Sequence, residues 1–134
     1  MQSANKNNRL MIPVAPGELL DKISILMLKQ EHLTDSAQLA YVRHELGLLE
    51  QVREQLPDSE ELNSLFDRLR EVNQQLWSIE DGLRAKEAAG KFDQIFIEQA
   101  RMVYINNDKR AAIKRAINEL LGSDIQEQKS YTGY

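Results

Sequence analysis

The sequence predicts an all-α protein: a bundle of four or five helices, with long antiparallel coiled-coil-like helices and an extended N-terminal arm. The strongest indication is a run of apolar residues at alternating steps of three and four, the spacing of one helix face. The three prolines all fall where a helix is expected to begin or end, and no strand-like alternation of β-branched residues occurs. We expect a single helical domain over residues 1–134, a common size for one domain.

The first half of the chain divides into an arm and two helices. Residues 1–15 lack a helical period and are expected to form the extended arm. Pro16 suits the first turn of a helix, because its missing N–H would be unpaired there in any case. This helix is expected to run to His32. A turn with a helix cap at residues 33–36 then precedes a second helix that reaches Leu56.

The third helix has the clearest pattern. Asp58 and Glu61 have the spacing of a capping box at its start, and Gly90 after Ala89 is a natural end. Between these limits the apolar seam runs through Leu62, Leu65, Leu69, Val72, Leu76, Ile79 and Leu83. Three heptads of this kind are typical of coiled-coil-like packing. The same surplus of apolar surface predicts a homo-oligomer.

The last third of the chain is predicted to be helical up to a polar tail. Residues 92–104 have a helical period, and the segment 105–107, which is β-branched and rich in Asn, is expected to bend the chain. A further helical run follows to Leu121, and Gly122 is expected to cap it. Residues 123–134 are the polar tail.

Composition and charge exclude several classes of function. The chain has no cysteine, which removes disulfides, thiolate metal sites and thiol nucleophiles. Its net charge of −4 gives no overall basic field for nucleic acid, and we expect no nucleic-acid partner. Residues 1–11 contain no apolar secretion signal, and no apolar run is long enough to cross a bilayer. We therefore expect a cytoplasmic protein without a membrane partner.

Motifs for metals and cofactors are missing or incomplete. His32 and His44 do not have the spacing of a metal-binding pair. Glu18 and Asp21 put two carboxylates on one helix face, a pattern that all-helical nucleotide pyrophosphatases of the MazG type use for magnesium. Their second, upstream Glu-x-x-Glu pair is absent. We favour the interpretation that the two acids interact with the helix dipole, and we predict no metal and no cofactor.

A stripe of polar residues lies where the helical pattern predicts a core. The face that begins at Phe96 and Val103 continues through polar positions before Ile117 restores apolar character. The candidate ligand-binding or polar-network residues on this stripe and its neighbour on the third helix are Asn73, Trp77, Glu80, Asp81, Arg84, Glu87, Arg101, Tyr104, Asn107, Arg110 and Lys114. Burying such groups is costly unless they are paired or meet a ligand.

Three interpretations of the stripe remain open. It is a solvated helix face, a structural network in which Glu80 and Glu87 pair with Arg101 and Arg110, or a pocket for a small anionic ligand. The hairpin geometry predicts that Glu80 and Arg101 lie opposite each other, because they are ten and eleven residues from Gly90. Arginine suits the third interpretation because its guanidinium binds carboxylate or phosphate bidentately.

Several runs of residues resemble a family of short, uncharacterised, all-helical bacterial and phage proteins. The resemblance begins with the sequence from Gly17 to Leu26 and continues through residues 72–87 and 92–118 to the tail at 129–131. Members of that family are often encoded near genes for cell-surface polysaccharide assembly. The resemblance therefore implies a glycan context, and it implies no catalytic role for any residue.

Two functional hypotheses follow. The first is a helical binding or interaction protein, homo-oligomeric, in which the polar cluster binds a partner or organises the core. The second is an enzyme acting on a phosphorylated or nucleotide-sugar substrate. In that case Glu80 or Asp81 would be the acid/base, and Arg101, Arg110 and Lys114 would hold the anion.

Overall fold

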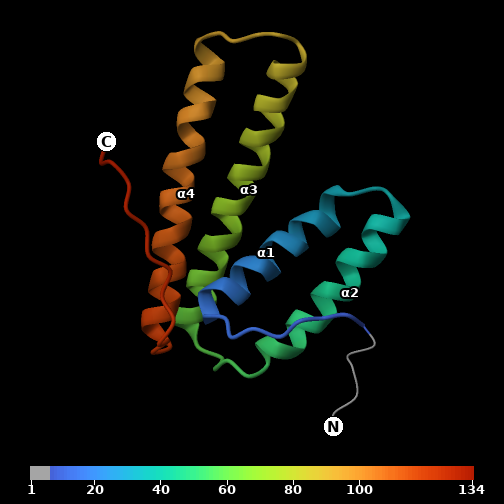
Figure 1. The fold of residues 1–134 in the computed structure, drawn as a ribbon, viewed down its shortest axis with the longest axis vertical. Coiled ribbons are helices and arrows are strands. Elements are labelled where there is room, and N and C mark those ends of the chain that lie inside the picture. The colour runs from blue at the N-terminus through green and yellow to red at the C-terminus, as the bar shows by residue number, and fades with distance from the viewer. Residues whose placement is uncertain (1–6) are drawn as a thin grey trace.

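The computed structural model describes residues 7–134, and it contains four helices and no strand in that range. They are α1 (Pro16–His32), α2 (Ser36–Arg53), α3 (Glu60–Ala88) and α4 (Gln94–Leu120). Figure 1 shows α3 and α4 as a long antiparallel hairpin, with α1 crossing its lower half and α2 packed outside α1. The prediction of an all-α bundle is confirmed, with four helices rather than five.

The helix ends agree with the sequence within two residues, with two exceptions at the start of α3 and the end of α2. Asp35 caps α2 by accepting a hydrogen bond from the Gln38 amide, and Gly90 and Gly122 both have a φ of +66° after the ends of α3 and α4. The predicted capping box of Asp58 and Glu61 is wrong. Ser59 caps α3 instead, through a bond from the amide of Leu62 to its hydroxyl oxygen. Also, α2 ends three residues before the predicted Leu56.

The predicted bend at residues 105–107 is absent, because α4 continues without interruption through that segment. Asn106 is fully buried there and donates from Nδ2 to the carbonyl of Met102, one turn earlier in the same helix. This local bond pairs the amide nitrogen without breaking the helix, while Oδ1 has no hydrogen-bond partner among the described residues. The long helix is therefore continuous where local propensity favoured a break.

The hydrophobic core lies in the lower half of the molecule, where α1 meets the hairpin. Its buried residues are Leu19, Leu20, Ile23, Leu62, Phe66, Leu69, Val72, Leu76, Ile113 and Ile117. The apolar seam of α3 supplies the central positions, as the heptad pattern predicts. Burial ends at Leu76 on α3 and starts again at Asn106 on α4. The upper half of the hairpin therefore extends beyond the core.

The arm lies at the lower end of the bundle, and the tail lies along α4 (Figure 1). Residues 8–15 form the predicted arm without helix or strand, and residues 1–6 of the predicted arm lie outside the described part. The tail after Gly122 reverses direction and runs back along α4 (Figure 1). It is attached there, because the Tyr134 hydroxyl donates to Asp108 at 2.6 Å.

Candidate functional site

A buried carboxylate, Asp21, lies where three helices meet. It sits on the second turn of α1 and is only 2% exposed. Arg110 of α4 donates to both of its oxygens: Nε binds Oδ1 at 2.9 Å, and Nη2 binds Oδ2. Hydrogen bonding to Asp21 is the main reason why the pKa of Arg110 is raised above its ordinary value. The result is a bidentate ion pair between helices, the geometry that suits arginine best.

Two further polar side chains complete the environment of Asp21. Nδ2 of Asn73, on α3, donates to Oδ1 of Asp21 at 2.9 Å and to Oγ of Ser24 at 2.7 Å. Ser24 in turn donates from Oγ to the Asp21 carbonyl at 2.7 Å. We call these four residues (Asp21, Ser24, Asn73 and Arg110) the Asp21 network. Its buried charge is paired and hydrogen-bonded, which is the condition under which a buried carboxylate is tolerated.

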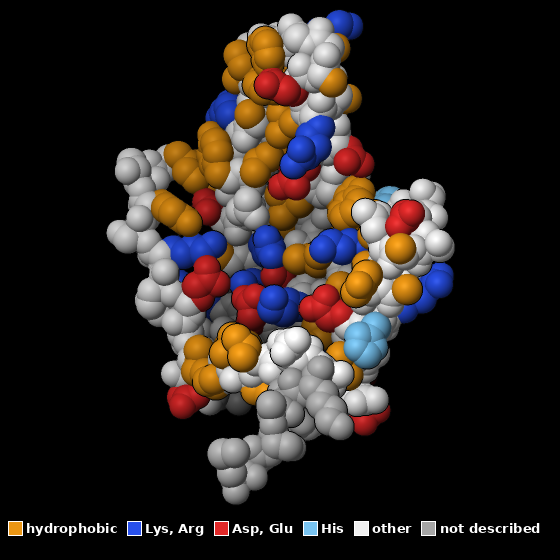
Figure 2. All heavy atoms as spheres, turned by 45° about the vertical axis from the view of Figure 1, so that its right-hand side comes forward, with side chains coloured by type: hydrophobic (Ala, Val, Ile, Leu, Met, Phe, Trp, Pro, Cys, Tyr) orange, Lys and Arg blue, Asp and Glu red, His pale blue; other side chains and the backbone are white. Residues whose placement is uncertain are grey.

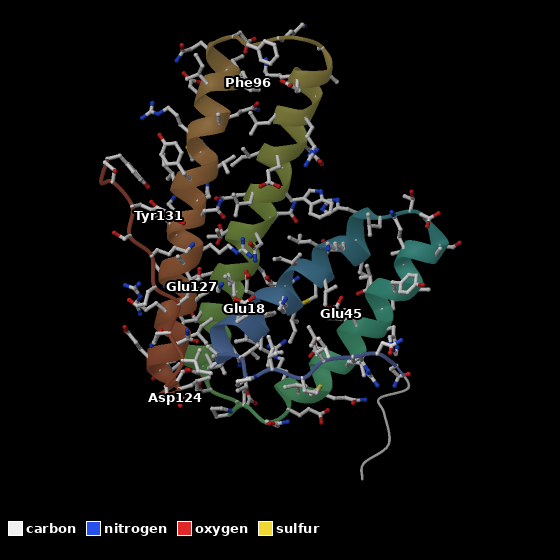
Figure 3. All side chains as sticks on the ribbon, in the orientation of Figure 1. Glu18, Glu45, Phe96, Asp124, Glu127 and Tyr131 are labelled. Atoms are coloured by element: carbon white, nitrogen blue, oxygen red, sulfur yellow. The ribbon has the colours of Figure 1, made fainter. Side chains whose placement is uncertain are left out.

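Lys114 lies one turn beyond Arg110 on α4 and binds carboxylates from two other segments. Its Nζ is 2.8 Å from Glu18 of α1 and 3.2 Å from Glu127 of the tail, and Asp21 lies 3.9 Å away. Burial alone would lower the pKa of Lys114, but these carboxylates outweigh burial and raise it. Lys114 correspondingly lowers the pKa of Glu127. Figure 3 shows Glu18 and Glu127 at a similar height along α4.

The start of α1 is in close contact with the backbone of α4. The Gly17 amide donates to Oδ1 of Asn118 at 2.7 Å. The Asn118 side chain therefore accepts a hydrogen bond from one of the amides at the start of α1 that have no partner within the helix. A Cβ at position 17 would come within 2.5 Å of the Lys114 carbonyl oxygen. Asn118 also donates to Gln126 of the tail at 3.3 Å. The α1–α4 contact therefore requires glycine at position 17.

A cleft of about 230 Å³ opens beside these contacts, between the arm, α4 and the tail. Its lining residues are Pro13, Val14, Ala15, Glu18, Ala111, Lys114, Arg115, Asn118, Ile125, Gln126, Glu127 and Lys129. Figure 2 shows charged side chains of both signs gathered in a band across the middle of the molecule. The walls come from three segments far apart in the sequence, so only the folded chain forms the cleft.

Three of the predicted site residues are brought together in this region. Asn73 and Arg110 meet at the Asp21 carboxylate, and Lys114 lies one turn away against Glu18. The antiparallel hairpin accounts for this meeting, because Asn73 lies seventeen residues before Gly90 and Arg110 twenty after it. The carboxylates that they bind are on α1, the helix that the sequence-based interpretation had left out.

Two predicted residues make aromatic contacts outside the Asp21 network. Trp77 stacks on His32 at the end of α1, with ring centroids 4.9 Å apart and planes at 16°. Tyr104 meets Tyr134 of the tail edge-on, at 5.2 Å. Each contact fastens another segment to the hairpin, and neither forms part of a polar cluster.

The remaining candidates lie apart from the network. Asn107 is half-buried, whereas the exposed residues are Glu80, Asp81, Arg84, Glu87 and Arg101. Within residues 7–134, Glu80 and Glu87 make no ion pair with Arg101 or Arg110. The structural network interpreted from the sequence therefore does not form with these partners. Arg110 binds Asp21, and Arg101 is on the exposed upper hairpin.

Several residues of the site were not found from the sequence. The sequence pattern assigns Asp21 to the helix dipole, and it does not single out Ser24, Gln126 or Glu127. One local signal existed: Glu18, Asp21 and Ser24 follow each other at steps of three on a helix that is otherwise rich in apolar residues. The tail residues carry no comparable pattern, since their contacts depend on the reversal of the chain after Gly122.

Over residues 7–134, no group of three or more His, Cys, Asp or Glu side chains is placed to hold a metal ion. Within the same range, no helix is both long and apolar enough to span a bilayer.

The fold and the site define a class: all-α proteins in which a helix is locked by a buried ion pair against a long helical hairpin. The chain belongs to a family of unknown function, DUF6165, whose model matches residues 10–134. The match includes part of the arm, all four helices and the tail. No curated protein and no solved structure matches the chain.

Proposed function

We propose that this chain is a homo-oligomeric interaction protein that docks through the free half of its α3–α4 hairpin, residues 77–105. The observation that carries the proposal is that no residue in this segment is buried, although the segment is helical almost throughout. Apart from the ring contacts of Trp77 with His32 and of Tyr104 with Tyr134, no other segment within residues 7–134 is seen to cover this part of the hairpin, which is not expected from stability alone. A docking surface supplies a reason for this exposure.

Apolar side chains are exposed along this free half. Phe92, Ile95 and Ile97 are 59%, 55% and 49% exposed, and Met102 and Tyr104 are also exposed. On α3, Ile79 and Leu83 continue the heptad seam but are only half-buried. Figure 2 shows hydrophobic side chains spread over this projecting part of the molecule, and Figure 3 places Phe96 near its end. Apolar surface of this kind is typical of protein interaction sites.

A second copy of the chain is the occupant that the charges favour. The free half contains four cationic residues (Arg84, Lys86, Lys91 and Arg101) and five anionic ones (Glu80, Asp81, Glu87, Asp93 and Glu98), a net charge of −1. Two copies therefore meet with little net repulsion and with both signs available for pairing. Two hairpins packed side by side form a four-helix bundle, in which the half-buried seam becomes core.

The position of the Asp21 network supports the proposal that the free half of the hairpin is a docking surface. It fastens α1 to the lower half of α3 and α4, below the free segment. The hairpin is therefore held at its base, and its upper half is presented as a pre-ordered surface. A surface that is ordered before binding loses less conformational entropy on association.

The alternative of an enzyme with Glu80 or Asp81 as acid/base gains no support from the geometry. Glu80 is ten residues before Gly90 and Arg110 is twenty after it. An offset of ten residues along antiparallel helices corresponds to about 15 Å at the ordinary helical rise. Arg110 is, in addition, already bound to the buried Asp21 carboxylate.

The cellular setting stays a prediction. We expect the protein in the cytoplasm, and the resemblance to bacterial and phage proteins encoded near polysaccharide genes suggests a partner in surface glycan assembly. A helical adaptor without a catalytic constellation is consistent with that role. Cell fractionation, followed by co-purification with enzymes of glycan assembly, is the direct measurement.

The experiment that tests the docking surface is sedimentation equilibrium of the whole chain. At tens of micromolar we expect a mass at least twice 15.4 kDa. The double variant Ile95→Glu with Met102→Glu changes one side of α4 and should give 15.4 kDa. Its matched control is Tyr41→Glu, an exposed apolar position on α2, which should leave the mass of the wild type. A wild-type mass of 15.4 kDa at that concentration contradicts the proposal.

A further inference from the structure

We infer that the cleft between the arm, α4 and the tail binds a small anionic molecule with an apolar body, such as an alkyl phosphate or carboxylate. Lys114, Arg115 and Lys129 would hold the anionic group. In the unliganded chain Glu127 of the tail would take the place of that group at Lys114. This inference is independent of the docking surface, because the cleft lies at the opposite end of the hairpin.

The size and walls of the cleft define the class of ligand. A volume of about 230 Å³ is at the small end of ligand sites. The lining includes apolar residues from three segments: Pro13 and Val14 of the arm, Ala111 of α4 and Ile125 of the tail. It also includes charged residues of α4 and the tail. An occupant with one charged group and a short hydrocarbon part matches this mixed lining.

The charges around the cleft favour an anion. Lys114, Arg115 and Lys129 line it, against the two carboxylates of Glu18 and Glu127. Arg115 is exposed and makes no hydrogen bond or ion pair with any residue in the described part of the chain. Its guanidinium is therefore available for a bidentate contact with phosphate or carboxylate.

The two carboxylates at Lys114 differ in how firmly they are held. Glu18 belongs to α1, which is locked by the Asp21 network, and it lies 2.8 Å from Nζ. Glu127 belongs to a tail without helix, its side chain is 53% exposed, and it lies 3.2 Å from Nζ. It also pairs with Lys129 at 3.6 Å. An incoming anion that displaced Glu127 would bind Lys114 and Lys129 in its place and would break the two ion pairs of one exposed side chain.

Contacts at the aromatic end of the tail would hold the tail against α4 while an anion replaces Glu127 at Lys114. Tyr134 is held by its bond to Asp108 and by the ring of Tyr104, and Lys129 lies over the ring of Tyr131. Figure 3 shows Tyr131 above Glu127, nearer to the start of α4. Displacement of Glu127 therefore needs only a side-chain movement, with the tail still attached at both sides of it.

The test uses butyl phosphate as probe, with inorganic phosphate for comparison, in isothermal titration of the whole chain. We expect butyl phosphate to bind more tightly than phosphate, because the apolar residues of the lining contact its alkyl part. Arg115→Gln should weaken binding about tenfold or more, the effect of losing one charge-assisted contact. Glu127→Gln should strengthen it several-fold, because the competing carboxylate is gone.

The matched controls are Arg84→Gln and Glu80→Gln, which change the same residue types at exposed positions of the hairpin. Both should leave the affinity unchanged. Circular dichroism of every variant confirms that the fold is kept. A dissociation constant weaker than about 10 mM for butyl phosphate, equal affinity for phosphate, or equal effects of Arg115→Gln and Arg84→Gln would each overturn the inference.

Discussion

Asp21 and Arg110 are 89 residues apart in the chain and form a bidentate ion pair at the junction of α1 and α4. Asp21 is almost completely buried, whereas Arg110 reaches it from the edge of the core. Asn73 joins the same carboxylate from α3. One side chain of α1 therefore determines how this helix is oriented against both helices of the hairpin.

Removing the charge of Asp21 should destabilise the fold strongly. Asp21→Asn leaves the Arg110 guanidinium without its partner and should lower the free energy of unfolding by about 3 kcal/mol or more. Urea denaturation of the variant measures this loss. Asp67→Asn removes an exposed carboxylate on α3 and should change stability by about 0.5 kcal/mol or less.

A double-mutant cycle on the same pair separates the contact from other effects. Arg110→Met alone should also be costly, because it leaves the buried Asp21 carboxylate with fewer donors. The double variant Asp21→Asn with Arg110→Met should cost clearly less than the sum of the two. Additive losses would show that Asp21 and Arg110 do not stabilise the fold as a pair.

Two glycines in helices should respond to alanine in opposite ways. At Gly17 the new Cβ meets the Lys114 carbonyl oxygen at 2.5 Å, so Gly17→Ala should destabilise by about 1–3 kcal/mol. At Gly47 on α2 no atom lies within 4 Å of the added Cβ, and Gly47→Ala should stabilise by up to about 1 kcal/mol. Thermal unfolding of both variants gives the comparison. A stabilised Gly17→Ala would contradict the close α1–α4 contact.

The tail should loosen from α4 in acid because of Glu127. Lys114 lowers the pKa of Glu127 below its ordinary value of 4.5. The ion pair therefore contributes stability above about pH 4.5, and this contribution is lost as the pH falls through the lower, folded-state pKa. Lys114, the partner of Glu127, behaves in the opposite sense, because its pKa is raised above the ordinary 10.5. The stability that Lys114 contributes is lost only as the pH rises through its raised, folded-state pKa.

Carboxyl NMR titration measures this directly. Glu127 should titrate below pH 4.5 in the wild type and closer to 4.5 in Lys114→Gln. A Glu127 midpoint that does not move with Lys114→Gln would exclude the ion pair.

The single tryptophan reports the contact between α1 and α3. Trp77 stacks on His32, so His32→Ala should shift its fluorescence to longer wavelength as the indole loses its cover. We also expect a loss of stability of about 1 kcal/mol from the ring contact. His44→Ala, on the exposed side of α2, should change neither quantity. Unchanged emission in His32→Ala would indicate that the end of α1 is not held against Trp77 in solution.

The sequence by itself determined the helices, because their signals are local. Heptad spacing in α3, Pro16 at the start of α1 and the glycines after α3 and α4 each act within a few residues of their position. The antiparallel hairpin followed from the short connection at Gly90 and brought Asn73 close to Arg110. Local propensity failed at residues 105–107, where packing of the buried Asn106 kept α4 continuous.

The partners of the polar residues were decided only by the tertiary structure. The sequence-based interpretation pairs Arg110 with Glu80 or Glu87 of α3, yet Arg110 binds Asp21, because α1 crosses the hairpin at that level. In the same way Lys114 meets Glu127 only because the tail turns back along α4. Ion pairs between distant segments depend on how the helices cross, and helical periodicity carries no information about crossing.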